Sequence, residues 1–281
     1  GAGGALGHDL IDLLTTAGAE VVGLDHAALD VGDGDAVSTA LNTHLPTVVI
    51  NAAAYTRVDD AETHEAEATQ VNGAAPGFFA SWCAARGARL IHVSTDYVFP
   101  GDADQPYEVD APTAPKSAYG RSKLAGEQAA LVAGGQVHVV RTSWLYGATG
   151  SSFVRSVGRR LQAGHAVDVV DDQRGAPTWT RHLASRLIAL GRADAAPGVW
   201  HCTSAGEASW FDVAVAVAEE LGCDPVLVRP TTSASLDRPA PRPAYSVLSN
   251  EKWRAAGLPE MPEWRAALRE AFAAVQDALI T

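Results

Sequence analysis

A tyrosine and a lysine lie four residues apart at the start of a predicted helix, in the segment SAYGRSKLAGE. Residues i and i+4 share one face of a helix, so the Tyr119 hydroxyl and the Lys123 ammonium can project into one cleft. A cation fixed near a phenol lowers the pKa of that phenol. The same spacing also suits an aromatic ring packed on an aliphatic stem, so the surrounding elements must decide between the two interpretations.

A glycine-rich turn opens the chain. Gly1, Gly4 and Gly7 follow the spacing GxxGxxG, and an amphipathic helix and then a strand come after them. Glycine is needed where such a turn is tight and where backbone approaches a pyrophosphate, which the N–H groups of the following helix can bind. Asp25 ends the next strand, the usual place for a group that binds the adenosine ribose. The pattern predicts a dinucleotide site, and we expect a further strand to precede Gly1.

Short apolar runs rich in Val and Ile alternate with helical patterns along the first half of the chain. They cover residues 19–25, 46–54, 88–96 and 137–147. A strand–helix–strand rhythm predicts an α/β fold with a doubly wound parallel sheet, covered by helices on both faces. Ligands of such sheets bind at the carboxyl ends of the strands, where Thr95 stands. Taken alone, Thr95 would be interpreted as a hydroxyl that caps backbone groups.

The rhythm loosens after residue 147. The segments DDQRGAPTWT and TTSASLDRPAPRPAYS have the Gly, Pro and Thr content of loops, and helical patterns return at 210–222 and 262–279. We therefore predict a nucleotide-binding domain over residues 1–147 that also recruits part of 166–196. Residues 148–281 are predicted to form mainly a smaller substrate-binding domain that closes over the first.

Composition limits the class of protein. A chain of 281 residues with 47% hydrophobic and 19% charged residues can bury a sizeable core. The net charge of −12 argues against nucleic acid or an anionic membrane as the main partner. Three widely spaced cysteines suggest neither a disulfide framework nor a zinc site, and the nine histidines show no metal-ligand spacing. We find no membrane span or secretion signal and expect a reducing, cytoplasmic location.

The order of the motifs resembles a known family. NAAAYTRVDDAE, STDYVF, YGRSKLAGE, RTSWLYG, DQRGAPT and RPAYSVLSNEK occur as they do in dTDP-4-dehydrorhamnose reductases of the extended short-chain dehydrogenase/reductase superfamily. The resemblance covers essentially the whole chain. It implies a Rossmann-like fold and reduction, by NADPH or NADH, of the 4-keto group of a dTDP-linked 4-keto-6-deoxyhexose. Such a step belongs to the biosynthesis of dTDP-L-rhamnose or a related deoxysugar.

The resemblance assigns catalytic roles to three residues. Reduction of a ketone places a hydride on carbon and a proton on oxygen, so a positioned acid is needed beside the nicotinamide. Tyr119 matches the proton donor, and Lys123 matches the residue that holds the nicotinamide ribose and lowers the pKa of the phenol. Thr95 matches the group that hydrogen-bonds the substrate oxygen.

Binding residues follow from the same matching positions. The cofactor contacts implied are Gly1, Gly4, Ala5, Leu6, Gly7, Asp25, Asp30, Val31, Ala53, Ala54, Tyr55, Thr56, Tyr119 and Lys123. Asp25 would repel a 2′-phosphate and so favours NADH, whereas many family members accept NADPH. Thr95, Asp96 and Trp144 match substrate contacts. Arg242 could pair with the substrate diphosphate or lie solvated in its Pro-rich loop.

Two alternatives stay open at this point. An epimerase or dehydratase would keep NAD tightly bound, but the related dehydratases carry an Asp-Glu pair after the threonine, and here Thr95 is followed by Asp96 and Tyr97. A non-catalytic NADP-binding subunit is the other alternative, since the regulatory subunit of methionine adenosyltransferase shares this branch. The presence of Thr95, Tyr119 and Lys123 together counts against it. The resemblance is compatible with a homodimer, assigns no metal-binding residues and leaves a dependence on Mg²⁺ open.

Overall fold

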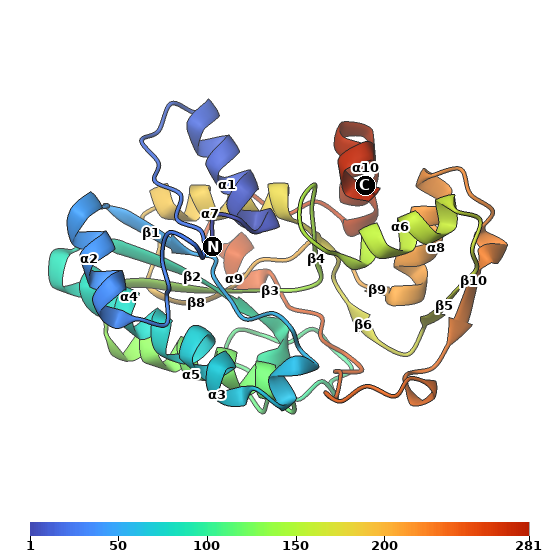
Figure 1. Cartoon of the computed structure of the whole chain (residues 1–281), viewed down its shortest axis with the longest axis horizontal. Helices are drawn as coiled ribbons and strands as arrows, with labels where there is room; N and C mark the ends of the chain where they lie inside the picture. The colour runs from blue at the N-terminus through green and yellow to red at the C-terminus, as the bar shows by residue number, and fades with distance from the viewer. Residues whose placement is uncertain (281) are drawn as a thin grey trace.

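A parallel four-stranded sheet forms the centre of the protein, seen here in a computed structural model that describes residues 1–280 (Figure 1). Its order is β1 (Val48–Asn51), β2 (Arg89–Thr95), β3 (Gln136–Thr142) and β8 (Gly198–His201). Most residues of β2 and β3 are buried, as expected for strands covered on both faces. The α/β architecture with a parallel sheet is therefore confirmed.

Helices cover the sheet on both faces. On one face lie α4 (Ala75–Arg86) and α5 (Ala118–Val132), with α2 (Gly34–His44) beside α4. On the other face, α1 (Ala5–Thr16) packs against α7 (Thr180–Arg192). Figure 1 shows α1 and α7 above the sheet and α4 and α5 below it. Two separate hydrophobic cores result, one on each face of the strands.

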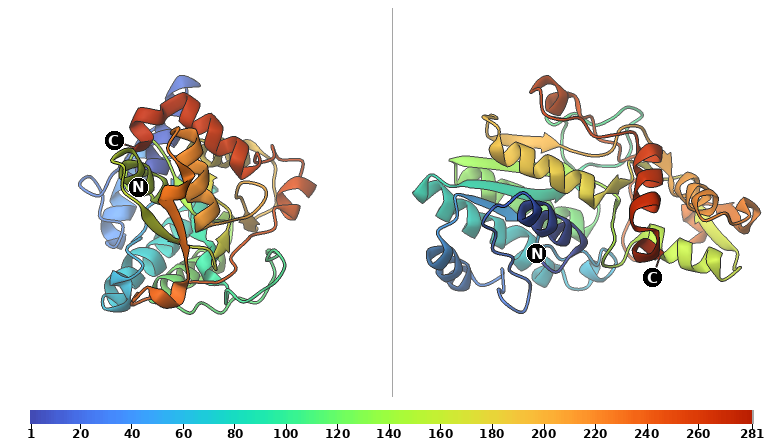
Figure 2. Two further views of the ribbon diagram at one scale, coloured as in Figure 1. Left: turned by 90° about the vertical axis from the view of Figure 1, so that its right-hand side faces the viewer. Right: turned by 90° about the horizontal axis from the view of Figure 1, so that it is seen from above.

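A second region lies beyond the carboxyl ends of β2 and β3. Its core is built on α6 (Phe153–Gln162), α8 (Trp210–Glu220) and α10 (Trp264–Ile280). Three short strand pairs border it: β5 (Val167–Val170) with β10 (Val228–Thr231), β4 (Leu145–Tyr146) with β7 (Thr178–Trp179), and β6 (Arg174–Gly175) with β9 (Ala208–Ser209). Figure 2 shows α10 lying across α6 and α8.

The helices predicted in the second half are confirmed as α8 and α10, within two residues at each end. The sheet also draws on this half, because α7 and β8 follow residue 147 in the chain. α7 lies inside the segment predicted to be shared between the domains, and β8 lies just beyond it. The boundary at residue 147 stays a prediction. No helix within residues 1–280 is both long and apolar enough to cross a membrane.

The strand predicted over residues 19–25 is wrong. The segment runs beside the glycine turn, where the Ala2 N–H donates to the Leu24 carbonyl at 3.1 Å, but it forms no strand ladder. A ladder needs a neighbouring strand about 4.8 Å away. A cavity of about 580 Å³ instead separates this segment from β1, and its lining includes Val21, Leu24 and Val49. The further strand expected before Gly1 stays a prediction.

The strand predicted over 137–147 is shorter than expected. It ends at Thr142, and Trp144 has a φ of 47°, in the left-handed region that a strand cannot contain. The chain then continues as β4 into the second region. This break places the residues that follow β3 between the sheet and the second core.

Candidate active site

The start of α5 is fixed by two caps. The Ser117 Oγ accepts a hydrogen bond from the Gly120 N–H at 3.1 Å, and a Glu62 carboxylate oxygen accepts from the Ala118 N–H at 2.8 Å. A side-chain oxygen at the N-cap satisfies N–H groups that the helix itself leaves free. These caps set the direction of the first turn, which carries Tyr119, and hence of the second turn, which carries Lys123.

Thr95 and Tyr119 meet at the carboxyl end of β2. Their side chains are in hydrogen-bond contact, and the single hydroxyl proton of Thr95 goes to Asp96 Oδ1 at 2.9 Å. The Tyr119 ring is half-buried and packs edge-on against Tyr97, with the ring centroids 5.6 Å apart. The structure thus brings the predicted proton donor and the predicted carbonyl-binding hydroxyl together.

Lys123 lies below this pair, 1% exposed, and its Nζ donates to the Val93 carbonyl at 2.6 Å. Burial lowers the pKa of Lys123 to about 8, and the charge of Glu127 opposes that shift. Burial raises the pKa of Tyr119 to about 12, the contact with Thr95 opposes this, and the Asp96 charge adds to it. The net shift in the pKa of the phenol is upward, and Lys123 is not among its causes, so the lowering of this pKa by Lys123 stays a prediction.

Asp96 is a buried carboxylate, 2% exposed. Burial raises its pKa to about 6, while hydrogen bonds from Ser246 and Thr95 hold it down. Within residues 1–280, Asp96 Oδ2 has no hydrogen-bond partner. A buried oxygen without a partner is costly, so this oxygen is poised to accept a hydrogen bond from a ligand hydroxyl.

The glycine turn lies against the loop that follows β1. A Cβ on Gly1 would stand 2.4 Å from the Ala52 carbonyl carbon and 2.5 Å from the Ala53 nitrogen. A Cβ on Gly7 would stand 2.2 Å from the Gly1 carbonyl oxygen. Only glycine fits at these two positions. Gly4 is the N-cap of α1 and offers no side-chain cap, so the first N–H groups of that helix stay available to an anion.

The other predicted residues in and beside this turn differ in how exposed their side chains are. Leu6 is buried in the core with Leu10, whereas Ala5 is half-buried at the start of α1. The Asp25 side chain lies beside the turn, since a Cβ on Gly3 would stand 3.5 Å from the Asp25 Cβ. Asp25 is exposed, and its Oδ1 accepts from the Ala28 N–H at 3.0 Å. It can therefore meet a ligand that lies on the turn.

Asp30 and Val31 come next along this edge. Asp30 is exposed and its Oδ1 accepts from the Gly32 N–H at 2.9 Å, while Val31 is 8% exposed and belongs to the core under α2 and α4. Gly32 is tied in turn to Gln70, whose Nε2 donates to its carbonyl at 2.6 Å. Asp30 can offer a carboxylate oxygen to a ligand, and Val31 can offer only a limited apolar contact.

The loop after β1 is held from below by two asparagines. Asn51 Oδ1 accepts from the Ala53 N–H at 3.1 Å, and Asn72 Oδ1 accepts from the Tyr55 N–H at 2.8 Å. Asn72 also donates to the Tyr55 carbonyl and to Ser122 Oγ, each at 3.0 Å. The backbone of this loop is therefore tied to α5. Asn72 joins two predicted parts of the site and was missed.

The sequence signal for Asn72 was its residue type alone, since its partners are distant in the chain. Asn72 lies in η2 (Gln70–Ala74), a π-helical turn, and it is fully buried. Asparagine is unfavourable inside a helix unless its side chain has another task, and π-helical turns are frequent at functional sites. In the same loop, Ala53 and Ala54 are half-buried, Tyr55 is buried with its hydroxyl on Asp60, and Thr56 is exposed.

Trp144 leaves the sheet at the same edge, two residues after β3 ends. Its ring stacks on Trp210, with centroids 3.5 Å apart and an angle of 5° between the planes. A Cβ on Gly175 would stand 2.4 Å from the Trp144 ring. The ring contact seen for Trp144 is with the second region, so the structure places it near the edge of the site and not against Tyr119.

Arg242 is mostly buried, its side chain 13% exposed, so the solvated alternative is wrong. Its guanidinium donates to Asp59 Oδ2 at 2.9 Å and to the Ala240 carbonyl at 3.0 Å. Its charge and that of Arg238 act on Tyr97, opposing the rise in the pKa of that phenol that burial causes. Two cations are therefore close enough to act on the Tyr97 phenol.

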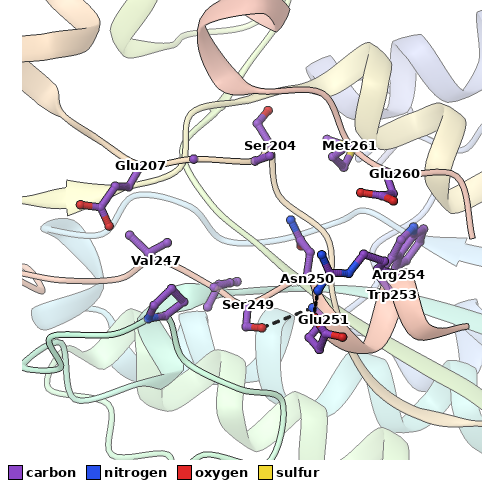
Figure 3. A pocket seen from close by; sticks show the side chains of 14 residues that line it. Ser204, Glu207, Val247, Ser249, Asn250, Glu251, Trp253, Arg254, Glu260 and Met261 are labelled. Carbon is purple, nitrogen blue, oxygen red and sulfur yellow. Dashed lines mark hydrogen bonds and ion pairs between the residues drawn. The ribbon is translucent and has the colours of Figure 1, made fainter.

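A cavity of about 370 Å³ lies between residues 204–207 and residues 247–254 (Figure 3). Its lining includes Ser204, Glu207, Asn250 and Met261, and none of the predicted site residues line it. No group of three or more His, Cys, Asp and Glu side chains suited to a metal ion occurs in the described part of the chain.

Comparison with known proteins places this site in context. Residues 1–277 match the family described as RmlD substrate binding domain. A Streptomyces antibioticus protein named probable dTDP-4,6-dihydroxy-2-methyloxan-3-one 4-ketoreductase is 54% identical over 97% of this chain and 92% of its own. The dTDP-4-dehydrorhamnose reductase of Streptomyces griseus is 49% identical over 98% and 92%.

Solved structures agree in fold. The crystal structure of dTDP-4-dehydrorhamnose reductase from Bacillus anthracis, in complex with NADP, aligns with a TM-score of 0.93 at 33% identity. The alignment covers 97% of this chain and 96% of that one. The corresponding enzyme from Clostridium acetobutylicum gives a TM-score of 0.92 at 36% identity, over 98% of both chains.

Proposed function

The chain belongs to the RmlD substrate binding domain family, that of the dTDP-4-dehydrorhamnose reductases, and on this premise we propose that it is an NAD(P)H-dependent oxidoreductase. It reduces the 4-keto group of a dTDP-linked 4-keto-6-deoxyhexose in deoxysugar biosynthesis. The observation that carries the proposal is the hydrogen-bonded pair of Thr95 and Tyr119 at the end of β2, with Lys123 one turn below.

The residues present fit a dinucleotide. Gly1 and Gly7 leave no room for side chains, and the first turn of α1 has free N–H groups for a pyrophosphate. Asp25 lies beside this turn, and with Asp30 and Val31 it would hold the adenosine end. The loop 53–56, whose Ala53 lies against Gly1, would lie beneath the cofactor, with Lys123 at the nicotinamide ribose. When bound, NADPH or NADH supplies the hydride.

The chain's own residues handle the proton and the sugar. Tyr119 has a pKa well above 7, so it is protonated at neutral pH and can donate its proton to the ketone oxygen. The Thr95 hydroxyl turns its one proton from Asp96 Oδ1 to the same oxygen as negative charge develops on it. Asp96 accepts from a sugar hydroxyl, and Trp144 packs on the sugar ring.

The anionic end of the substrate has a suitable partner as well. Arg242 and Arg238 flank Asp59 at 2.9 and 3.8 Å, and a diphosphate could take over part of this pairing. Arginine binds phosphate oxygens through two parallel N–H groups, so it suits this role. These two cations would bind the anionic substrate locally, although the chain as a whole has a net charge of −12.

The alternatives differ in a specific residue. Tyr97 stands where the related dehydratases have a glutamate, so no second carboxylate is available there. Burial also raises the pKa of its phenol. This favours a reductase over an enzyme that eliminates water. A cytoplasmic location and a homodimer stay predictions.

One assay tests the proposal. Purified protein is mixed with dTDP-4-keto-6-deoxyglucose, with or without a 3,5-epimerase, and with NADPH or NADH, and both nicotinamide absorbance and sugar products are followed. Stoichiometric loss of reduced cofactor with formation of a dTDP-6-deoxyhexose is expected. Isomerised sugar without net oxidation of cofactor would identify an epimerase. Cofactor binding without turnover of any keto sugar would identify a non-catalytic subunit.

A further inference from the structure

Helix α5 places a third functional group on the face that carries Tyr119 and Lys123. Glu127 follows at the next i+4 position and is 2% exposed. A carboxylate is almost never buried this deeply without partners, because desolvation of its charge is costly. Partners must therefore compensate the desolvation of the Glu127 carboxylate.

Glu127 is bound by two groups from two neighbouring strands. Its Oε1 accepts from Ser94 Oγ on β2 at 2.5 Å and from Arg141 Nε on β3 at 2.9 Å. Its Oε2 accepts from Arg141 Nη2 at 2.7 Å. Arg141 is itself 4% exposed, and its Nη1 donates to the Val109 carbonyl at 3.2 Å. The result is a buried, bidentate ion pair between helix and sheet.

Three consecutive residues of β2 bond to α5. Residues 93, 94 and 95 of the strand each bond one residue of the helix: Lys123 to the carbonyl of 93, Glu127 to the hydroxyl of 94, and Tyr119 to the hydroxyl of 95. Because the three helix residues lie one turn apart, α5 cannot slide or rotate on β2 without breaking all three bonds. Glu127 is the member of this series that carries the opposite charge to Lys123.

The charges that face Lys123 come from few groups. Glu127 attracts its ammonium along α5, and Tyr119 on the same helix is protonated. His92 on β2 is fully buried, and burial together with Lys123 holds its pKa well below the ordinary value, so it is neutral. Arg141 on β3 is bound to Glu127 and would repel Lys123 if that carboxylate were removed.

We propose that Glu127, held by Ser94 and Arg141, is a positioning residue for the reduction: it fixes α5 on β2 so that Tyr119 meets Thr95 while the Lys123 ammonium stays charged at the ribose. The roles of Tyr119 and Lys123 in this statement rest on the proposed function. Glu127 touches neither cofactor nor substrate in this scheme. It acts through Lys123 and through the register of the helix.

Glu127→Gln tests the proposal, with Glu65→Gln as the matched control. Arg121 on the same helix binds Glu65 with the same bidentate geometry, at 2.7 and 2.9 Å, but both side chains are almost half exposed. NADPH affinity is measured by fluorescence across pH, together with turnover and melting temperature. In Glu127→Gln, the pH at which NADPH affinity falls by half is expected to drop by about one unit. Turnover is expected to fall about tenfold to a hundredfold.

Two further variants separate positioning from mere stability. Glu127→Asp keeps the charge but leaves a small void, so it should lose melting temperature and yet keep the pH midpoint near that of the wild type. Ser94→Ala removes one bond of the series without disturbing the ion pair, and should lower turnover several-fold with little loss of melting temperature. Glu65→Gln should match the wild type in both readouts.

The proposal is overturned if Glu127→Gln lowers the melting temperature but keeps the wild-type pH midpoint, or if Glu127→Asp and Glu127→Gln shift that midpoint equally. Unchanged turnover in Ser94→Ala would also count against it. These results are distinct from failure of the proposed function. If the wild type binds NADPH but reduces no dTDP-linked keto sugar, the assigned reaction is wrong, and the binding midpoints still report on Glu127.

Discussion

The Lys123 ammonium donates a 2.6 Å hydrogen bond to the carbonyl oxygen of Val93, two residues before Thr95 on the same strand. The bond ties the amine to the strand that carries the predicted carbonyl-binding hydroxyl. It leaves the other N–H groups of the ammonium free for a ribose, since Lys⁺ has three. Burial at this position lowers the pKa of Lys123 to about 8, so its charge is sensitive to mildly alkaline pH.

We expect NADPH affinity to fall as the pH rises through about 8. The ammonium is charged below its pKa and can donate to the ribose, and above it the amine is neutral and the interaction weakens. Lys123→Met should bind NADPH more weakly at neutral pH and lose this dependence. Fluorescence titration across pH measures both. Equal affinity of the variant and the wild type at every pH would remove Lys123 from the cofactor site.

Tyr119→Phe should reduce turnover by roughly 10²-fold or more, because general acid catalysis contributes about that much. NADPH affinity should stay nearly unchanged, since the variant loses one hydroxyl. Tyr97→Phe is the matched control, because its ring packs against Tyr119 at 5.6 Å but its hydroxyl has no assigned role. Steady-state kinetics on both variants make the comparison. A similar loss of turnover in the two variants would show that the hydroxyl of Tyr119 is not the proton donor.

Part of this site could be predicted from the sequence. Spacing alone placed Tyr119 and Lys123 on one face of a helix, and glycine spacing placed the turn before α1, because both depend on local geometry. The sign of the shift in the pKa of Tyr119 could not be predicted, since it depends on burial by residues distant in the chain. Asn72 and Glu127 were missed for the same reason: their partners lie 17 and 33 residues away.

The fold shows the same division. The apolar runs that became β1, β2 and β3 have neighbours on the sheet that satisfy their backbone groups. Residues 19–25 also contain strand-forming residues such as Val21 and Val22, yet propensity alone forms no strand without a paired neighbour, and none pairs with them within residues 1–280. The break at Trp144, with its left-handed φ, is likewise set by tertiary contacts with Trp210 and Gly175.

Asp96→Asn should stabilise the protein at neutral pH. The pKa of Asp96 is raised to about 6 in the folded protein, so its protonated form is favoured by folding. That contribution is full below the unfolded pKa of about 3.9 and is lost as the pH rises through about 6. Near pH 7.5 the variant should gain about 1 to 3 kcal/mol in free energy of unfolding.

Denaturant unfolding as a function of pH measures this effect. At a pH well below the unfolded pKa of about 3.9, Asp96 is protonated in both states, so the variant and the wild type should have nearly equal free energies of unfolding there. The variant should also bind the sugar nucleotide more weakly, because an amide cannot accept with both of its terminal atoms. A gain in stability that did not depend on pH would contradict the electrostatic explanation.

Trp210→Leu tests whether Trp144 is held ready for the sugar. The stack of the two rings fixes the orientation of Trp144, and such pairs contribute about 0.5 to 1.5 kcal/mol. We therefore expect the KM for the sugar nucleotide to rise about twofold to tenfold with little change in kcat. Trp82→Phe, in the core between α4 and the sheet, should leave KM unchanged. A loss in kcat alone for Trp210→Leu would exclude a role in ground-state sugar binding.

Asp25 offers a test of cofactor preference. Its carboxylate is exposed beside Gly3 of the glycine turn, so it can accept from the hydroxyls of an adenosine ribose and would repel a 2′-phosphate. Two like charges about 4 Å apart in water repel by about 1 kcal/mol, and the phosphate carries nearly two charges. Asp25→Asn keeps the size of the side chain and can keep the 3.0 Å bond from the Ala28 N–H. It should therefore raise kcat/KM for NADPH relative to NADH by about tenfold.

Asp33→Asn is the matched control for this change. Asp33 is also an exposed aspartate that accepts backbone N–H bonds, at 2.9 and 3.1 Å, but it caps α2 and has no assigned cofactor contact. Asparagine caps helices as well as aspartate, so its effect on stability should be small. The ratio of kcat/KM for the two cofactors should stay at the wild-type value in Asp33→Asn and should change in Asp25→Asn. Raising the salt concentration should reduce the difference, because exposed charges are screened. A ratio that is the same in all three proteins would show that Asp25 does not face the ribose 2′ position.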